Sequence, residues 1–176
     1  MRTVVLRVVA LALLLLLALV GVITARTLSR MPDTLVYLTR DTGRTFRLEA
    51  VPRVARPRDG IEERVRAQVA ALVEGPTPAE AEEGLGTAVP AGTRVLGARL
   101  EDGVLTVDLS REFTSGGGTA SMLGRLYQLY YTLSQPKDVE AVSVLVEGEP
   151  LRVLGGEGII VDPVWVRAEH PQEPAW

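Results

Sequence analysis

The chain has no cysteine and only one histidine among its 176 residues. Without cysteine it can form neither disulfides nor thiolate metal sites, and no thiol is present to carry an N-terminal lipid. The single histidine, His170, lies in a proline-containing C-terminal segment. A histidine-based metal centre or catalytic dyad within one chain is therefore not expected, and we predict no metal site, no cofactor and no catalytic residue.

Lysine is almost absent too, because Lys137 is the only one and arginine supplies the other basic residues. The four charged residues before Met31 are all arginines, whereas the remainder carries 15 basic and 22 acidic residues, a net charge of −7. A mildly acidic main part argues against nucleic acid or anionic lipid as the principal partner.

The longest uncharged run extends over residues 8–25. Its 18 positions would span about 27 Å as a helix, close to the thickness of a bilayer core. We therefore expect a single-pass anchor, with an N-terminus in the cytoplasm and a domain outside it. A cleaved signal peptide followed by secretion is the alternative. The anchor is favoured because Ile23-Thr24-Ala25 is a poor small-x-small cleavage site.

Residues 94–110 predict a β-hairpin. Asp102-Gly103 fits a two-residue turn with positive φ, and apolar residues alternate with polar ones on both sides of it. One face should be buried under helices, and the other, with Val95, Arg99 and Asp108, should be largely solvated. The predicted cross-strand pairs are Glu101–Val104, Leu100–Leu105, Ala98–Val107 and Leu96–Leu109.

The remaining pattern predicts an α+β fold, a small mixed sheet with two helices packed on one face. One helix should start with Asp59 as N-cap and end before Gly75-Pro76, and the other should cover residues 119–135. Strands are expected at 35–38, 46–50 and 139–147, with an edge strand at 151–154 and a final strand across 159–166. Residues 77–92 should form a long loop.

Few patterns point to chemistry. Gly116-Gly117-Gly118 precedes a helix but lacks the lysine of a phosphate-binding loop. Two carboxylate pairs, Asp108/Glu112 and Glu82/Glu83, have the residue types of a glycosidase, although Asp108 is as well explained by pairing with Arg99. Three tyrosines could form a speculative ligand surface, although tyrosines at helical spacing more often pack in a core. They are Tyr127, Tyr130 and Tyr131.

Three segments occur in this order: LVEGPT (72–77), VPAGTRVLGARLEDGVLTVDLSREF (89–113) and YTLSQPKDVEAVSVLVEGEP (131–150). Together they resemble the GerMN domain of sporulation and spore-germination proteins of the GerM type. The positions that match the family motifs, with a structural or interaction role, are Gly75, Pro76, Pro90, Gly92, Asp108, Leu109, Thr132, Leu133 and Gln135. The resemblance covers roughly residues 35–153 and implies an extracytoplasmic, membrane-anchored module with a helix-strand-strand-helix-strand core like that of ring-building domains. This chain has room for one copy, whereas GerM has two.

The expected organisation is an anchor or signal sequence at 1–30, a linker at 31–34, a GerMN-like domain at 35–167 and a flexible tail at 168–176. The expected function is that of a non-catalytic envelope protein with a protein–protein interaction or assembly domain. Its partners would be the membrane, through residues 8–25, and envelope proteins or a second copy, but no nucleic acid. The alternative is a module that binds peptidoglycan, another sugar or a small ligand.

Overall fold

The computed structural model describes residues 13–22, 24, 32–43, 45–54, 60–155 and 158–167. The chain divides into two units, residues 1–32 and 33–176, which are described separately. Residues 13–22 are helical with exposed apolar side chains. Within the described residues, no helix is long and apolar enough to cross a membrane. The predicted anchor lies partly, and the predicted tail with His170 wholly, outside those residues.

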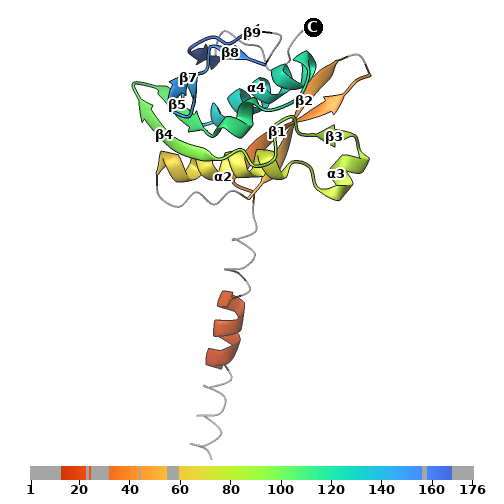
Figure 1. Cartoon of the computed structure of the whole chain (residues 1–176). Coiled ribbons are helices and arrows are strands. Elements are labelled where there is room, and N and C mark those ends of the chain that lie inside the picture. Colours follow the sequence, from red (N-terminus) through yellow and green to blue (C-terminus); the bar gives the residue numbers. More distant parts are fainter. Residues whose placement is uncertain are drawn as a thin grey trace, which may run out of the picture. The chain divides into compact units, whose positions relative to one another are not determined.

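The second unit is a mixed α+β domain (Figure 1). Its elements fall in the predicted order of helix, two strands, helix and strand (α2, β4, β5, α4, β6), preceded by a hairpin. The elements are β1 (Thr34–Asp41), β2 (Phe46–Arg53), α2 (Ile61–Glu74), α3 (Pro78–Glu82), β3 (Leu85–Gly86), β4 (Val95–Glu101), β5 (Val104–Leu109), a 3-10 turn (Arg111–Thr114), α4 (Thr119–Leu133), β6 (Ala141–Val146), β7 (Glu149–Pro150), β8 (Val153–Leu154), β9 (Ile159–Ile160) and β10 (Trp165–Val166).

The larger sheet has the strand order β10-β6-β5-β4, with β7 also paired to β6. β4 and β5 are antiparallel, whereas β5 and β6 are parallel and are joined through α4. A parallel pair needs such a crossover, because its strands start at the same edge of the sheet. The predicted mixed sheet is confirmed.

The β4–β5 hairpin has the predicted turn, with φ of 49° at Asp102 and 78° at Gly103. Three of the four predicted pairs are confirmed, but the pairing of Leu96 with Leu109 is wrong. A β-bulge between Val95 and Gly97 inserts one residue, so that Val95 lies opposite Leu109. Since neighbouring residues face opposite sides, Val95 is buried and Leu96 is 44% exposed, the reverse of the prediction.

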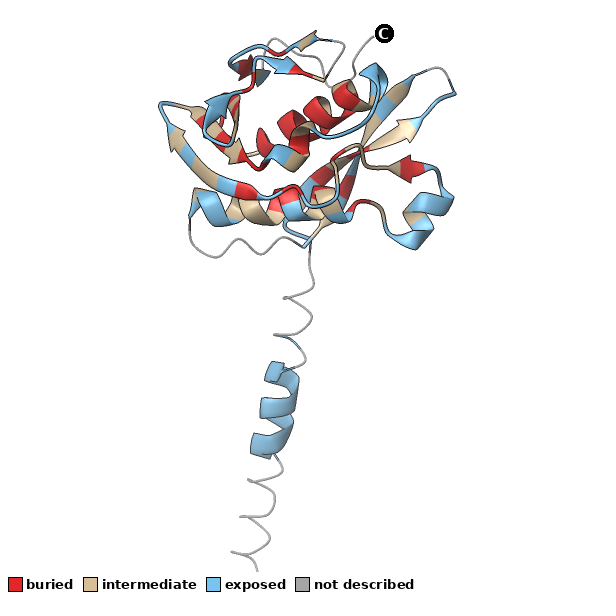
Figure 2. Cartoon of the chain, viewed as in Figure 1, coloured by how far each residue is buried: buried red, intermediate tan, exposed pale blue. Residues whose placement is uncertain are grey.

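A second sheet, with the order β2-β1-β3, was not expected as a separate layer. β1 and β2 pair without interruption from Thr34–Arg53 to Asp41–Phe46. α4 lies between the two sheets and is the most buried helix (Figure 2). On one side Tyr130 stacks on Trp165 of β10 with ring centroids 5.0 Å apart. On the other side Thr132 bonds to β1. The prediction of one sheet with helices on a single face is thus incomplete.

Polar side chains of α4 and of the turn that follows it bind the open edge of β1. Gln128 Nε2 donates to the Tyr37 carbonyl at 2.9 Å, and Thr132 Oγ1 accepts the Tyr37 N–H at 3.1 Å. Gln135 Nε2 donates to the Leu35 carbonyl at 2.5 Å, and Gln135 Oε1 accepts the Leu35 N–H at 3.0 Å. β3 pairs with β1 only at the other end of the strand. These side chains therefore take the place of a neighbouring strand, and we call the set the edge clasp.

Other boundaries differ from the prediction. α2 begins at Ile61 with Gly60 at the N-cap position, while Asp59 lies outside the described residues. The predicted loop at 77–92 contains α3 and β3. The predicted edge strand at 151–154 and final strand at 159–166 are instead a small β8–β9 hairpin and β10, which pairs with β6. These strands of two residues each are too short for periodicity to reveal.

Replacing Gln128, a fully buried member of the clasp, should cost more than replacing the half-buried Gln135. Gln128→Met leaves the Tyr37 carbonyl and the Ala88 N–H without their partner, because Gln128 Oε1 also accepts from Ala88 at 2.7 Å. We expect a loss of about 2–4 kcal/mol in the free energy of unfolding of residues 33–176, measured in urea. Gln135→Met should cost about 1 kcal/mol, because water can reach Leu35. Equal losses would contradict this role of the clasp.

Candidate functional site

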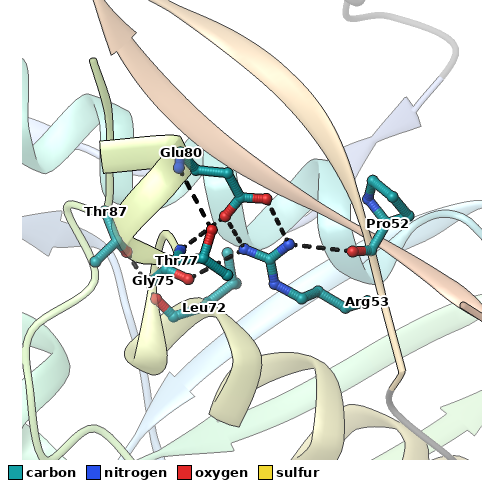
Figure 3. A network of polar contacts seen from close by, with 7 residues as sticks. All are labelled: Pro52, Arg53, Leu72, Gly75, Thr77, Glu80 and Thr87. Carbon is teal, nitrogen blue, oxygen red and sulfur yellow. Dashed lines mark hydrogen bonds and ion pairs between the residues drawn. The ribbon is translucent and has the colours of Figure 1, made fainter. Parts of the chain in front are cut away.

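The motif pair Gly75-Pro76 ends α2 inside a polar network (Figure 3). Gly75 has φ of 72°, and its N–H bonds to the Ala71 carbonyl at 3.1 Å. A Cβ at this position would lie 2.8 Å from Thr87 Cγ2, a distance that real Cβ atoms do not show. Thr87 in turn donates its hydroxyl to the Leu72 carbonyl at 2.7 Å. Glycine is therefore required by both the backbone and the neighbouring threonine.

Arg53 of β2 connects the elements of this network. Its guanidinium forms a bidentate ion pair with Glu80 of α3, at 2.9 Å (Nη1–Oε1) and 2.6 Å (Nη2–Oε2). The same nitrogens donate to the carbonyls of Pro52 and Gly75 at 3.1 and 3.2 Å. The two side chains are only 17% and 21% exposed. Such a geometry fixes α2, α3 and β2 relative to one another.

Glu80 also completes a capping box with Thr77 at the start of α3. The Thr77 N–H donates to Glu80 Oε2 at 2.8 Å, and the Glu80 N–H donates to Thr77 Oγ1. The hydrogen bonds from Arg53 lower the pKa of Glu80 to about 2, against the opposing effect of burial. This carboxylate stays charged down to low pH and is structural.

The other motif residues also hold the backbone. Pro90 and Gly92 form a turn in which the Thr93 N–H bonds to the Pro90 carbonyl at 3.2 Å and Gly92 has φ of 86°. Asp108 Oδ1 accepts the Gly148 N–H at 3.0 Å and so joins β5 to the turn after β6. Leu109 and Leu133 are fully buried, and Thr132 and Gln135 belong to the edge clasp.

The three tyrosines of the predicted ligand surface do not form one exposed platform. Tyr130 and Tyr131 are each 5% exposed and contact Trp165 at 5.0 and 5.3 Å between ring centroids. Burial raises the pKa of the Tyr130 hydroxyl. Only Tyr127 is partly exposed, beside a small cavity that Tyr130 and Ile159 also line. Two of the three rings are therefore unavailable for stacking on a sugar, because they stack within the core.

Of the four carboxylates considered for catalysis, those of Asp108 and Glu112 have partners within the fold, and Glu82 and Glu83 are exposed. Asp108 bonds to Gly148 as described, and Arg99 lies 3.5 Å from Glu101 instead of pairing with Asp108. A hydrogen bond from Ser110 lowers the pKa of Glu112. Glu83 terminates α3 through its backbone. In the part of the chain that the structure describes, no cluster of three or more acidic or histidine residues could hold a metal.

A cavity of about 390 Å³ was not foreseen from the sequence. It lies between the β1–β2 turn, the segment after β3 and the first turns of α4. The Thr39 hydroxyl donates to the Gly86 carbonyl at 3.0 Å, so its oxygen is left to accept a hydrogen bond from a ligand. Thr87 also lines the cavity, but its hydroxyl donates to Leu72 and accepts the Val89 N–H at 3.2 Å. Asp41 adds a carboxylate and Phe46 an aromatic ring. This lining favours a ligand that donates hydrogen bonds.

The Arg53–Glu80 pair predicts a specific pH dependence. Because the pKa of Glu80 is about 2 in the fold and 4.5 for an unperturbed glutamate, its contribution to stability is present above pH 4.5 and is lost as the pH falls toward 2. We expect wild-type residues 33–176 to lose roughly 2 kcal/mol more than Glu80→Gln between pH 5 and 2 in urea titrations. Glu82→Gln, in the same helix, leaves the pair intact and is the control. Parallel pH profiles for wild type and Glu80→Gln would refute the pair's role.

Comparison with known proteins bears on the resemblance to GerMN domains. The family model described as "Germane: Sporulation and spore germination" matches residues 35–152. Comparison with curated proteins gives no match.

Solved structures share the fold at low identity. The tandem GerMN domains of the sporulation protein GerM from Bacillus subtilis align with a TM-score of 0.59 and 18% identity, over 78% of this chain and 48% of that one. This chain thus spans about half of the tandem structure. The first GerMN domain of the same protein gives 0.59 and 18%, over 77% and 99% of the two chains. A candidate lipoprotein from Clostridium perfringens gives 0.54 and 18%, over 81% and 91%.

At this identity the solved structures establish the fold alone, whereas the family model spans more than half of the sequence. The nine motif positions fall within or beside turns, strands and the ends of helices α2 and α4 of that fold. The chain therefore belongs to the Germane family of sporulation and spore-germination domains, which confirms the resemblance to GerMN domains.

Proposed function

We propose that this protein is a non-catalytic, membrane-anchored envelope component whose Germane domain binds other proteins or itself outside the cytoplasm. The observation that carries the proposal is the use of the motif residues inside the fold. Gly75, Asp108, Thr132 and Gln135 all hold backbone groups in place. Because these groups hold the fold, exposed main-chain groups and apolar side chains are left to bind a partner protein.

An interaction role is supported by the exposed face of the β1–β2 hairpin. Leu35 is 39% exposed, and Ala50 and Pro52 on the neighbouring strand are also exposed. Leu35 lies directly opposite Pro52, so these side chains share one face of the sheet. Apolar side chains gathered in this way are typical of a surface that another protein covers.

The location is supported by the uncharged run at 8–25 and by family membership. One solved structure of the same fold is that of a candidate lipoprotein. This chain has no cysteine for a lipid, so its hydrophobic N-terminal segment would serve as the anchor instead.

Cell fractionation with protease protection tests this location. A full chain with a C-terminal tag should sediment with membranes and resist carbonate extraction. The tag should be digested by protease added to cells whose outer layers are removed while the inner membrane is intact. Digestion only after the inner membrane is breached would refute external placement. A soluble extracytoplasmic chain that starts after residue 25 would replace the anchor by a cleaved signal peptide.

A second candidate function, binding of a sugar or another small ligand from the cell wall, is supported by the 390 Å³ cavity. Its acceptor-rich lining suits hydroxyl and amide donors of a saccharide, and Phe46 offers a ring to stack on. This cavity, rather than the tyrosines of α4, is where such a ligand would bind.

Blocking the cavity tests the second candidate. Ala120 is exposed and lines the cavity at the start of α4. Ala120→Trp should weaken binding of a β-1,4-linked N-acetylglucosamine tetramer by at least tenfold in calorimetry, since the indole would occupy the cavity. Ala70→Trp, at an exposed position of α2, should bind as the wild type does. Absence of binding to the wild type, or equal binding by both variants, would eliminate this function.

A further inference from the structure

The long strands of the domain differ in how their edges are covered. The open edge of β1 is bound by the edge clasp of α4. The edge of β4 carries a bulge, and Arg66 of α2 donates to the Val95 carbonyl on it at 2.5 Å. For the outer edge of β2, no comparable cover occurs among the described residues. An uncovered edge is a template for pairing with another strand.

The register determines which groups of β2 point outward. Main-chain groups of Leu35 and Tyr37 point toward α4, so those of Val36 and Leu38 point toward β2. Since paired residues exchange bonds at every second position, the N–H and C=O groups of Leu48 and Ala50 face away from β1. The ladder has no bulge, and these outward groups lie in a regular extended strand.

The side chains of β2 are complementary to themselves. Arg47 is 62% exposed and Glu49 is 37% exposed, on the same face and two residues apart. Glu49 Oε2 already accepts from Arg40 of β1 at 2.7 Å, so Oε1 is the oxygen that would meet Arg47 of the second copy. On the opposite face Leu48 is half-buried, and Ala50 is exposed next to it. In this strand an arginine precedes the central leucine and a glutamate follows it. A two-fold axis at that leucine would therefore place the arginine of each copy opposite the glutamate of the other.

We propose that β2 pairs antiparallel with β2 of a second copy, with the two-fold axis at Leu48. The two copies of Leu48 would exchange main-chain bonds, and Phe46 of each copy would do so with Ala50 of the other. Arg47 would lie opposite Glu49 of the second copy, twice. The apolar faces that include Leu35 and Ala50 would then become continuous across the axis. This inference rests on the proposed interaction function and names its partner.

Other registers are less favourable. An axis at Glu49 would place two glutamates directly opposite each other. An axis at Ala50 would bring Pro52 into a bonding position, where it has no N–H to donate. Leu48 is the central position that avoids both costs while keeping the apolar residues together.

Cysteine cross-linking tests the register, because the chain has no cysteine of its own. In the proposed dimer the two copies of residue 48 have Cα atoms about 5.5 Å apart, within disulfide range, whereas the two copies of residue 50 are about 14 Å apart. Full-length Leu48→Cys in detergent should therefore oxidise to a disulfide-linked dimer at least tenfold faster than Ala50→Cys. Equal rates, a faster Ala50→Cys, or no dimer from Leu48→Cys would overturn the proposal.

A charge variant provides a second readout that needs no cysteine. Arg47→Glu places like charges opposite each other and should weaken dimerisation by about tenfold in sedimentation velocity. Arg152→Glu, at an exposed position outside the strand, changes the net charge equally and should leave dimerisation unchanged. Equal effects of the two variants would contradict pairing through β2.

The two proposals can fail separately. In native membranes, linkage of Leu48→Cys to a protein of different mass would refute self-pairing and leave the interaction function standing. A chain that stays monomeric and forms no disulfide from residue 48 or residue 50 would refute self-pairing. If proximity labelling of the full chain also finds no partner, the interaction function itself is refuted.

Discussion

The fold depends on how the open edge of β1 is bound. A buried strand edge without partners would leave several main-chain groups unsatisfied, each at a cost of about 1–3 kcal/mol. α4 removes this cost with Gln128 and Thr132, four residues apart on one helical face, and the following turn adds Gln135. A helix thereby does what a strand would otherwise do. Because its polar side chains point inward, α4 can be largely buried between two sheets, and only its first two residues, Thr119 and Ala120, are exposed.

The opposite half of α4 is fixed by a buried arginine. Arg125 is 2% exposed and donates to the carbonyls of Ala88 (3.0 Å), Phe113 (2.6 Å), Ser115 (3.1 Å) and Gly116 (3.0 Å). Its guanidinium also lies 5.9 Å from the centre of the Phe113 ring, and burial lowers its pKa. The start of the glycine run before α4 is therefore held through the Gly116 carbonyl, which gives Gly116 a structural role that needs no phosphate.

Local signals in the sequence were sufficient for the β4–β5 hairpin, because Asp102-Gly103 specifies a turn with positive φ at both residues. The bulge at Leu96 could not be predicted, since it depends on how β4 meets α2 and the end of β5. α3 could have been found from its capping box, Thr77 and Glu80, had the prolines and glycines around it not suggested a loop.

The larger omission concerned polar residues inside α4. Helical periodicity assigns arginine, glutamine and threonine to the solvent side of a helix, so the pattern does not place Arg125 and Gln128 in the core. Without them, the predicted helix has only one buried face, and no second sheet is expected to pack on it. Likewise the family motifs located the positions that matter, but their roles as caps and clasps came only from the partners that the fold brings to them. Residues whose partners lie far away in sequence cannot be assigned from spacing alone.

The two proposed binding surfaces meet on the β1–β2 hairpin. Phe46 lines the cavity and is at the same time the first residue of β2. In the pairing of two β2 strands it lies opposite Ala50 of the second copy, so a ligand in the cavity and a second copy on the strand would share this residue. A ligand and a second copy that alter each other's affinity must do so by the same factor. Phe46, which both would contact, is the residue through which such a coupling of self-pairing and cavity occupation would act.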